Sequence, residues 1–385
     1  MKILLGGIPL GCDNIGDEAI IACVVKMLKE SIPGVELTVA TADPSTAGRL
    51  GVSVAPLYGF TREYPIHNSR SSLSTLHSSL STAFSRYDAY VWCGATGLSD
   101  YPHVGLGLLE IAQHAGVPTF VWGVGMDYEL NPVFFEAHGK RRMLLRIFGL
   151  VGIYERMLRA RLRRRIARVL PRCKGVWVRD PQSASMLASM GFRYAEVTAD
   201  SAIMFQSHQA PSTKRQAPTL GLCISTQRQV TDLQGVNGMI AAVRASGARI
   251  LGIPMNPKTD RALLERLGVA CIPGTTPEAV SEAAAKCDVV LSSRLHLLIL
   301  AANVGTPILG IARGSKLANW LINFGRAVEG SVSDCDWRLV TEHVLSSLAN
   351  RGDWDSVRAA AYEKLTERLE KARAEFVRML EACHA

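Results

Sequence analysis

Residues 288–316, which read DVVLSSRLHLLILAANVGTPILGIARGSK, decide the fold. Their first apolar run, 289–291, is short and β-branched, which is typical of a buried strand in a parallel sheet. Residues 295–304 then carry apolar side chains on most faces of a helix. A second strand is expected over 308–311. The stretch therefore predicts a β–α–β unit, and with it an α/β protein.

Polar and charged side chains follow each of these two strands. They are Ser292, Ser293, Arg294 and His296 after the first strand and Lys316 after the second. Because ligands of open α/β sheets bind at the carboxyl ends of the strands, we expect these side chains to form one small cationic site. Taken singly, each charged residue also has a structural explanation: an ion pair for Arg294, an ordinary first-turn position for His296, and solvent for Lys316. The three together on successive strand ends favour a binding site.

The same alternation of strands and helices extends along the chain, whose 385 residues are enough for two domains. We predict an amino-terminal domain over 1–206 and a carboxyl-terminal domain over 219–350. A polar, proline-bearing linker at 207–218 would separate them. A long closing helix is expected over 353–383, because its apolar residues recur every three or four positions.

Each predicted domain contains short apolar runs separated by amphipathic helices. The runs expected as strands are 2–6, 36–40, 52–57, 90–93, 119–121 and 176–178, then 220–224, 249–253, 269–272, 289–291 and 308–311, with a short strand-like run at 326–329. Their composition predicts parallel sheets covered by helices on both faces. The serine- and threonine-rich stretch 61–85 is expected to be a mobile loop with a helix from Ser71, at the mouth of the site.

Composition places the chain among globular proteins, with 48% hydrophobic and 20% charged residues. Nine cysteines show no C-x-x-C pair, which favours reduced thiols in the cytoplasm. Glycines interrupt the apolar run at the amino terminus, so we interpret it as a strand and a signal peptide is not expected. No apolar run approaches the roughly 18 to 20 residues of a membrane span. These features predict a cytoplasmic protein.

The net charge of +9 is concentrated in one segment. Thirteen lysines and arginines and a single acid fall within 140–174, a local excess of +12 that leaves about −3 for the remainder. We interpret 132–174 as a basic helical insertion whose apolar patch and arginines are typical of a helix on an anionic membrane surface. The alternatives are a solvated basic helix packed on the sheet and an RNA-binding patch. No aromatic platform accompanies the arginines, so we expect no nucleic-acid partner.

Four glycines surround the first predicted turn, at positions 6, 7, 11 and 16, where the backbone can bend sharply. Their spacing is neither the dinucleotide-binding G-x-G-x-x-G nor the P-loop G-x-x-x-x-G-K. Asp17 and Glu18 open the helix expected over 17–29, and their charge would repel a phosphate there. The pair therefore suits a ligand with hydroxyl groups, although helix capping also explains both residues. The chain lacks an H-E-x-x-H metal motif and a G-x-S-x-G nucleophile motif.

In these two stretches the sequence resembles the polysaccharide pyruvyl transferase family. The family's carboxyl-terminal signature, S-S-R-L-H, an apolar helix, G-x-P, a strand and a lysine, is matched by Ser292, Ser293, Arg294, Leu295, His296, Gly305, Pro307 and Lys316. Its amino-terminal signature is matched by Gly7, Gly11, Asn14, Ile15, Gly16, Asp17, Glu18 and Ala19. Weaker matches lie at 178–180 and 198–200. One departure is that Ala95 and Thr96 stand where family members usually have consecutive glycines.

The resemblance implies a GT-B-like architecture, in which two Rossmann-like domains face each other across a cleft and the long carboxyl-terminal helix crosses back. It implies transfer of the enolpyruvyl group of phosphoenolpyruvate to two hydroxyls of a sugar as a pyruvate ketal, with release of phosphate. The acceptor would be a cell-envelope glycan or a lipid-linked precursor. Neither a metal nor a cofactor is expected.

The resemblance also implies roles for residues of this chain. The residues expected to bind the substrates are Arg294, Lys316, Arg179, Ser292, Ser293, Asn14 and Gly16. His296 would protonate the methylene carbon of the donor, and Asp17, from the first domain, would orient or deprotonate the acceptor hydroxyl. Arg179 also has a structural explanation, a network with Asp180.

Two other functions remain open. A nucleotide-sugar glycosyltransferase of the GT-B type would use the same two domains, although such enzymes more often carry a carboxylate near the ribose. A non-catalytic binding or regulatory module would have kept the fold alone. For a pyruvyl transferase, the basic segment 140–174 would place the protein peripherally on the inner face of the membrane. The sequence leaves the acceptor sugar and the oligomeric state open.

Overall fold

The computed structural model describes residues 1–61, 73–206, 217–225, 232–332 and 334–384. They form two compact units. Unit 1 comprises Met1–Gly11, Val24–Asp200 and Arg368–Ala385, and unit 2 comprises Cys12–Cys23 and Ser201–Glu367. Residues 12–23 thus group with the second half of the chain. The sequence-based division at 206 and 219 stays a prediction, and most of its linker, residues 207–216, lies outside the described part of the chain.

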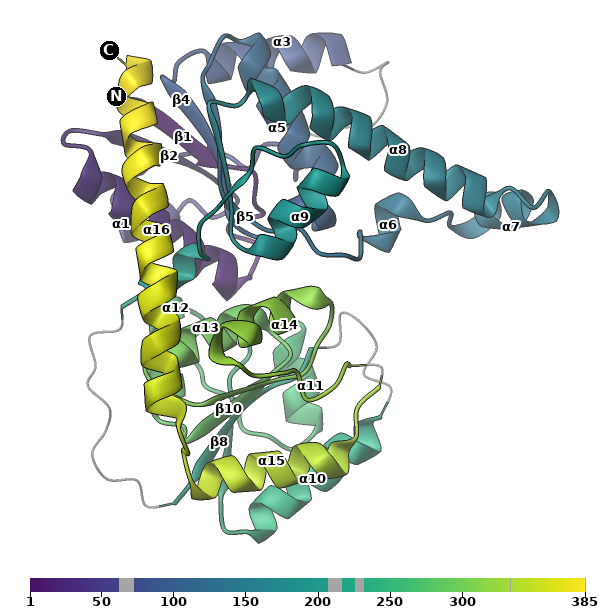
Figure 1. Cartoon of the computed structure of the whole chain (residues 1–385), viewed down its shortest axis with the longest axis vertical. Helices are drawn as coiled ribbons and strands as arrows, with labels where there is room; N and C mark the ends of the chain where they lie inside the picture. The colour runs from purple at the N-terminus through teal and green to yellow at the C-terminus, as the bar shows by residue number, and fades with distance from the viewer. Residues whose placement is uncertain (62–72, 207–216, 226–231, 333, 385) are drawn as a thin grey trace. The chain divides into compact units, whose positions relative to one another are not determined.

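Unit 1 is built on a seven-stranded parallel sheet of order β3-β2-β1-β4-β5-β6-β7 (Figure 1). Its strands are β1 Lys2–Gly6, β2 Glu36–Thr41, β3 Ser53–Pro56, β4 Ala89–Cys93, β5 Thr119–Val124, β6 Gly175–Val178 and β7 Glu196–Val197. Every residue of the central strands β4 and β5 is buried, so both faces of the sheet are covered. This is the arrangement that the near-continuous apolar runs predicted.

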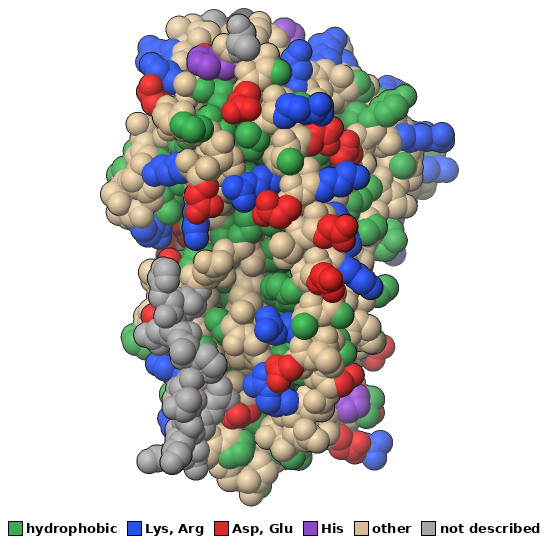
Figure 2. Space-filling model, turned by 60° about the vertical axis from the view of Figure 1, so that its left-hand side comes forward, with side chains coloured by type: hydrophobic (Ala, Val, Ile, Leu, Met, Phe, Trp, Pro, Cys, Tyr) green, Lys and Arg blue, Asp and Glu red, His purple; other side chains and the backbone are tan. Residues whose placement is uncertain are grey.

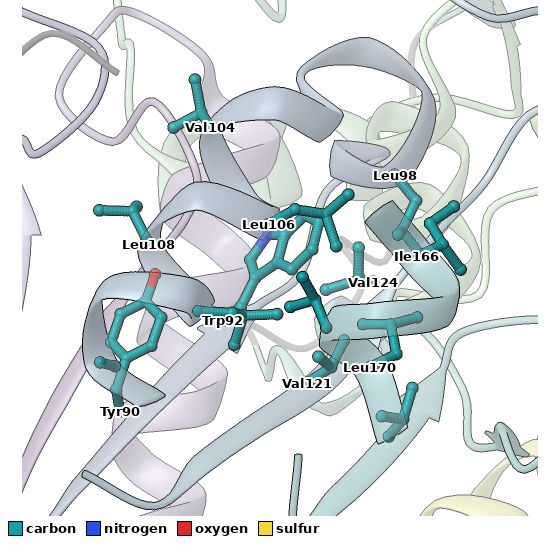
Figure 3. Close-up of a cluster of buried hydrophobic side chains, with 14 of the residues drawn as sticks. Tyr90, Trp92, Leu98, Val104, Leu106, Leu108, Val121, Val124, Ile166 and Leu170 are labelled. Carbon is teal, nitrogen blue, oxygen red and sulfur yellow. The ribbon is translucent and has the colours of Figure 1, made fainter. Parts of the chain in front are cut away.

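Successive side chains of β5 point to opposite faces, so its residues enter two different packing groups. On one face, Val121 and Val124 join a cluster around Trp92 (Figure 3). On the other face, the Trp122 ring stacks on Phe376 with 4.7 Å between centroids, and Trp177 lies 5.4 Å from Phe376. The tryptophans on this face of the sheet, Trp122 and Trp177, therefore pack on Phe376.

Strand β5 runs to Val124 and thus beyond the strand expected over 119–121. The register of β5 with β6 shifts between Trp122 and Val124, and Gly123 there has a φ of +65°. A glycine can take this left-handed conformation without a side-chain clash, so the chain uses it for a bulge within the strand.

Unit 2 is built on a four-stranded parallel sheet of order β11-β10-β8-β9. Its strands are β8 Thr219–Cys223, β9 Arg249–Gly252, β10 Val289–Ser292 and β11 Ile308–Gly310. The strand predicted at 269–272 is wrong, because that run makes a single bridge, Gly252 to Cys271. The strand-like run at 326–329 is not a strand either, although Glu329 N donates to Gly310 O. The α/β class with parallel sheets is confirmed.

Helices occupy most of the remaining described residues. They are α1 Ile15–Ser31, α2 Thr46–Leu50, α3 Leu73–Phe84, α4 Gly97–Asp100, α5 Pro102–His114, α6 Pro132–Phe135, α7 Gly139–Ile147, α8 Val151–Val169, α9 Pro181–Ser189, α10 Leu233–Ala245, α11 Asp260–Arg266, α12 Pro277–Ala285, α13 Leu295–Asn303, α14 Ser315–Leu321, α15 Trp337–Ala349 and α16 Trp354–His384. The expected helix after Ser71 corresponds to α3, and residues 62–72 of the expected loop lie outside the described residues.

Helix α16 is the predicted closing helix. Its apolar stripe is buried from Ala361 to Leu380, at positions 361, 365, 369, 372, 376 and 380. Residues up to Glu367 belong to unit 2 and those from Arg368 to unit 1. Among the helices that can be described, none combines the length and the apolar character of a membrane span.

Candidate functional site

The candidate site lies in unit 2, at the carboxyl ends of β8 and β10. Strand β8 is flanked by β9 on one side and by β10 on the other, so the chain reverses its direction across the sheet between β8 and β10. Ligands of open α/β sheets bind at this topological switch point. Two loop serines tie the strand ends together, because Ser225 N donates to Ser293 Oγ over 2.9 Å.

The residues after β10 are fixed by local hydrogen bonds. Ser292 Oγ accepts from Arg294 N (2.9 Å) and donates to Arg294 O (3.0 Å). This short turn leads into α13, and its hydroxyl explains why a serine suits the last position of the strand. Both serines are fully buried, so they act here as parts of the scaffold.

Arg294 makes a two-pronged ion pair with a carboxylate that sequence reasoning had not assigned to the site. Its Nε donates to Asp260 Oδ2 (3.0 Å) and its Nη2 to Asp260 Oδ1 (2.7 Å). Asp260 is fully buried and also accepts from Asn256 N (2.9 Å) and Thr259 Oγ1 (3.2 Å). Asp260 therefore compensates the charge of Arg294 and orients its side chain, which is the structural role that the sequence left open.

The segment 12–23 packs on the same loops of unit 2. Ile15 N donates to Met255 O over 3.1 Å, and Asp13 forms an ion pair with Lys258. Gly16 lies directly against the His296 ring, since a Cβ at position 16 would lie 2.1 Å from His296 Nδ1. Only glycine leaves room for the imidazole here, which gives the glycine of the amino-terminal signature a physical reason.

Asp17 is the buried carboxylate of this segment, with 2% of its surface exposed. Its Oδ2 accepts from Asn14 Nδ2 over 2.7 Å, while Asn14 Oδ1 accepts from Gly16 N over 3.3 Å. Burial raises the pKa of Asp17 to about 6, although the charges of His296 and Lys316 and the bond from Asn14 lower it. Both cationic groups therefore lie near enough to act on the carboxylate. A carboxylate, an imidazole and an ammonium meet in one site.

Arg179 lies in unit 1 and has a different environment. Its guanidinium is 4% exposed, and its Nε donates to Asp180 Oδ2 (3.2 Å) while Nη1 lies 3.6 Å from Asp200 Oδ2. Burial lowers the pKa of Arg179, but the two carboxylates raise it by more. Gly125 makes room for it, because a Cβ there would lie 2.6 Å from the guanidinium carbon. These contacts match the structural network that the sequence offered as the alternative.

Unit 1 also contains the turn at which the chain departs from the family pattern. Ala95 has a φ of +59°, a left-handed conformation that glycine adopts at little cost and alanine at a cost of about 1 kcal/mol. The backbone thus keeps the course that a glycine would give it. Ala95 O accepts from Gly125 N over 2.7 Å, which holds the turn in place.

The structure thus brings together in unit 2 all but one of the residues predicted for the site. They are Asn14, Gly16, Asp17, Ser292, Ser293, Arg294, His296 and Lys316. Arg179 belongs to unit 1. Within the described ranges, no group of three or more His, Cys, Asp or Glu side chains is placed to hold a metal ion.

Comparison with known proteins agrees with this arrangement. The family model for polysaccharide pyruvyl transferase matches residues 14–315, which include eight of the nine predicted site residues; Lys316 directly follows the matched range. No curated protein sequence matches the chain.

Solved structures of low sequence identity share the fold. The glycotransferase of kitacinnamycin has a TM-score of 0.59 at 11% identity, covering 98% of this chain and 99% of its own. A putative UDP-N-acetylglucosamine 2-epimerase from Listeria monocytogenes has a TM-score of 0.57 at 11% identity, over 93% and 91% of the two chains. The spinosyn rhamnosyltransferase SpnG has a TM-score of 0.54 at 16% identity, over 99% and 100%. The predicted GT-B-like fold is therefore confirmed.

Proposed function

This chain belongs to the polysaccharide pyruvyl transferase family, and from that premise we propose that it transfers the enolpyruvyl group of phosphoenolpyruvate to a sugar. The product is a cyclic pyruvate ketal, and phosphate is released. The observation that carries the proposal is the meeting of Asp17, His296 and Lys316 at the switch point of the unit 2 sheet.

The donor requires positive charge, because phosphoenolpyruvate carries a phosphate and a carboxylate on three carbons. Lys316 supplies an ammonium whose charge lowers the pKa of the buried Asp17. Arg294 lies at the amino end of α13, where Asp260 holds its guanidinium in a fixed orientation. We propose that these two cations bind the two anionic groups of the donor, and that no metal is required. Arg179 is left out of this donor site, because its guanidinium lies between two carboxylates and its side chain is 4% exposed, against 15% for Arg294.

The reaction requires one acid and one base. In the first step, His296 donates a proton to the methylene carbon of the donor while an acceptor hydroxyl attacks the neighbouring carbon. Asp17 takes the proton of that hydroxyl. In the second step, another hydroxyl of the same sugar attacks the same carbon and gives its proton to His296, which the first step left neutral. Phosphate leaves with the electron pair of the broken C–O bond and takes the proton held by Asp17. A carboxyl group with a pKa of about 6 is suited to take a proton near neutral pH.

The remaining predicted residues hold these groups in place. Gly16 leaves the space that the His296 ring occupies, and Asn14 orients Asp17 through its hydrogen bond. Ser292 and Ser293 fix the turn before α13 and its link to β8. We propose that these four residues act on the substrates through the side chains that they position.

The acceptor is a sugar, and we propose that it is a cell-envelope glycan or its lipid-linked precursor. Because such precursors are carried on the inner face of the membrane, the enzyme works in the cytoplasm, peripherally at that surface. The structural neighbours support a second candidate, since one of them, the putative UDP-N-acetylglucosamine 2-epimerase, is named for a nucleotide-linked sugar. On that reading the chain is a nucleotide-sugar glycosyltransferase.

A thermal-shift screen with phosphoenolpyruvate and a panel of nucleotide sugars separates the two candidates without knowledge of the acceptor. We expect stabilisation by phosphoenolpyruvate that Lys316→Ala weakens and that Lys364→Ala, an exposed lysine of α16, leaves unchanged. Stabilisation by a nucleotide sugar alone would favour the glycosyltransferase. No stabilisation by either donor class would favour a non-catalytic module. With an acceptor in hand, a mass gain of one pyruvate less one water identifies the ketal.

A further inference from the structure

The basic insertion of unit 1 is a helical hairpin whose outer part is unburied. Helices α7 and α8 are joined by a turn at Phe148–Leu150, in which Gly149 has a φ of +63°. None of the residues 138–161 is buried. In Figure 1, α8 runs alongside α5 and then continues beyond it to meet α7.

The inner end of α8 anchors the hairpin. Its buried side chains are Leu162, Ile166 and Val169, and Figure 3 shows Ile166 in the cluster around Trp92. Glu110 of α5 accepts hydrogen bonds from Arg165 Nη2 (2.7 Å) and Arg168 Nη2 (2.5 Å). These contacts explain why the inner end of α8 is buried. The alternative of a solvated basic helix packed on the sheet therefore leaves the outer part of the hairpin unexplained.

The two arms of the outer part are fastened to each other. Arg141 Nη1 donates to Tyr154 Oη over 2.8 Å, and its guanidinium lies 5.5 Å from the centre of the Tyr154 ring. Ala137 N donates to Glu155 Oε1 over 3.4 Å. The hairpin therefore has a defined shape although it buries no core of its own.

Large apolar side chains cover this outer part. The exposed ones are Met143 (68%), Leu144 (57%), Ile147 (68%), Phe148 (66%), Leu150 (41%), Ile153 (54%) and Met157 (39%). They make up seven of the fourteen exposed large hydrophobic residues described in the chain, within fifteen positions. Exposed apolar patches of this kind mark surfaces that bind another protein or a membrane.

The charges around the patch are almost all positive. Residues 140–159 contain Lys140, Arg141, Arg142, Arg146, Arg156 and Arg159 against the single acid Glu155. On the face where α16 runs, by contrast, acidic and basic side chains are interspersed (Figure 2). Apolar side chains flanked by lysine and arginine match a bilayer surface, where acyl chains lie beneath anionic phosphates.

We propose that the α7–α8 hairpin docks on an anionic lipid membrane. Ile147 and Phe148, at the turn, enter the boundary between headgroups and acyl chains, and the surrounding arginines pair with lipid phosphates. The proposal adds to the proposed function the surface by which the enzyme reaches a lipid-linked acceptor. Its test measures lipid binding and not pyruvyl transfer, so the two proposals can fail separately.

The experiment is co-sedimentation of the full-length protein with vesicles of phosphatidylcholine containing phosphatidylglycerol, and with vesicles of phosphatidylcholine alone. Binding is expected for the anionic vesicles only, and it should weaken as salt is raised. The double variant Ile147→Glu with Phe148→Glu should lower the partition coefficient about tenfold or more. Ile322→Glu is the matched control, because Ile322 is 72% exposed in unit 2 and away from the hairpin residues in sequence.

A second variant tests the charges separately. Arg146→Glu should weaken binding to anionic vesicles, whereas Arg378→Glu, at a side chain 75% exposed on α16, should leave it unchanged. Melting temperatures of all four variants close to wild type would show that the fold is kept. Equal binding to neutral vesicles, no vesicle binding, or self-association of the protein that the Ile147/Phe148 variant abolishes without lipid would overturn the proposal. Binding to RNA in place of anionic vesicles would overturn it as well.

Discussion

Two buried clusters of charge invite comparison, the one around Arg179 in unit 1 and the one around Asp17 in unit 2. The Arg179 cluster surrounds one guanidinium with carboxylates, which raise its pKa in spite of its burial. The Asp17 cluster contains a carboxyl group whose pKa is raised to about 6, because its burial outweighs the nearby His296 and Lys316. The surroundings of Arg179 therefore favour its charged form, whereas the surroundings of Asp17 disfavour the charged form of that carboxyl group.

The difference indicates what each cluster does. A buried charge that its neighbours compensate holds the fold together and changes little with pH. A buried carboxyl group that is undercompensated costs stability near neutral pH, and such groups collect at functional sites. We therefore expect changes in the unit 1 cluster to act on stability, and changes in the unit 2 cluster to act on turnover and on the response to pH.

The largest expected effect is on stability. Arg179→Met should lower the free energy of unfolding by about 3 to 5 kcal/mol, because Asp180 and Asp200 would lose their buried partner. Urea unfolding of the purified variant measures it. Arg378→Met, which removes an exposed arginine of α16, should cost less than about 1 kcal/mol. Normal stability of Arg179→Met combined with weaker donor binding would instead make Arg179 a ligand of the substrate.

The next effect is on turnover. His296→Ala should lower kcat by about 10²-fold or more, because the methylene carbon would lose its proton donor, while binding of phosphoenolpyruvate stays measurable. Steady-state kinetics and a donor titration provide the two readouts. His343→Ala is the matched control, since His343 Nδ1 lies within hydrogen-bond distance of Glu329 Oε2, both in unit 2. Near-normal turnover in His296→Ala would refute the assignment.

Asp17→Asn should separate function from stability. The substitution removes the proposed base, so turnover should fall and the decline in activity below a pH of about 6 should disappear. It should also stabilise the protein, by about 1 to 3 kcal/mol, because the folded state no longer holds a buried carboxylate.

The sign of this stabilisation follows from the raised pKa. Folding raises the pKa of Asp17 from 3.8 to about 6. Above a pH of about 4 the carboxyl group therefore ionises more readily in the unfolded state, which lowers the stability of the folded state. The gain should therefore be full above pH 6 and vanish as the pH falls below about 4. Thermal melts across this range measure it. Asp43 has a lowered pKa through its bonds from Ser45, so Asp43→Asn should show no such gain. A gain at Asp17 that does not depend on pH would contradict the raised pKa.

The smallest effect is on donor affinity. Lys316→Ala should raise the KM for phosphoenolpyruvate about tenfold, because one of two cations would be lost from the donor site. The same kinetic assay gives the value, with Lys364→Ala as the control for loss of a lysine. An unchanged KM would show that Lys316 does not bind the donor. Its role would then be its effect on the pKa of Asp17.

Much of the fold could be predicted because its signals are local. The run 2–6 gave the bounds of β1, and the run 36–40 gave those of β2 to within one residue. The strand predicted at 269–272 was wrong, because β-branched residues favour an extended backbone but do not show whether a neighbouring strand can pair with it along its length. The strand expected over 119–121 was too short, because a glycine such as Gly123 is found in turns as well as in the bulges that lie within strands.

The site could be predicted as a set of residue types, but its contacts could not. Arg294, His296 and Lys316 could be predicted because they follow recognisable strands in the sequence, β10 for the first two and β11 for the third. Asp260 was missed as a partner of Arg294, because 34 residues separate the two and no pattern links them. The packing of Gly16 on His296 and the grouping of 12–23 with unit 2 likewise depend on tertiary structure alone.

That neither unit is a continuous stretch of the chain has a consequence for synthesis on the ribosome. Residues 12–23 emerge early, but the segments with which they group, 201–367, are translated much later. Trp122 and Trp177 in turn wait for Phe376, which is translated later still. The nascent chain therefore holds two unfinished cores until α16 has been translated, and a product truncated before Phe376 leaves Trp122 and Trp177 without that packing partner.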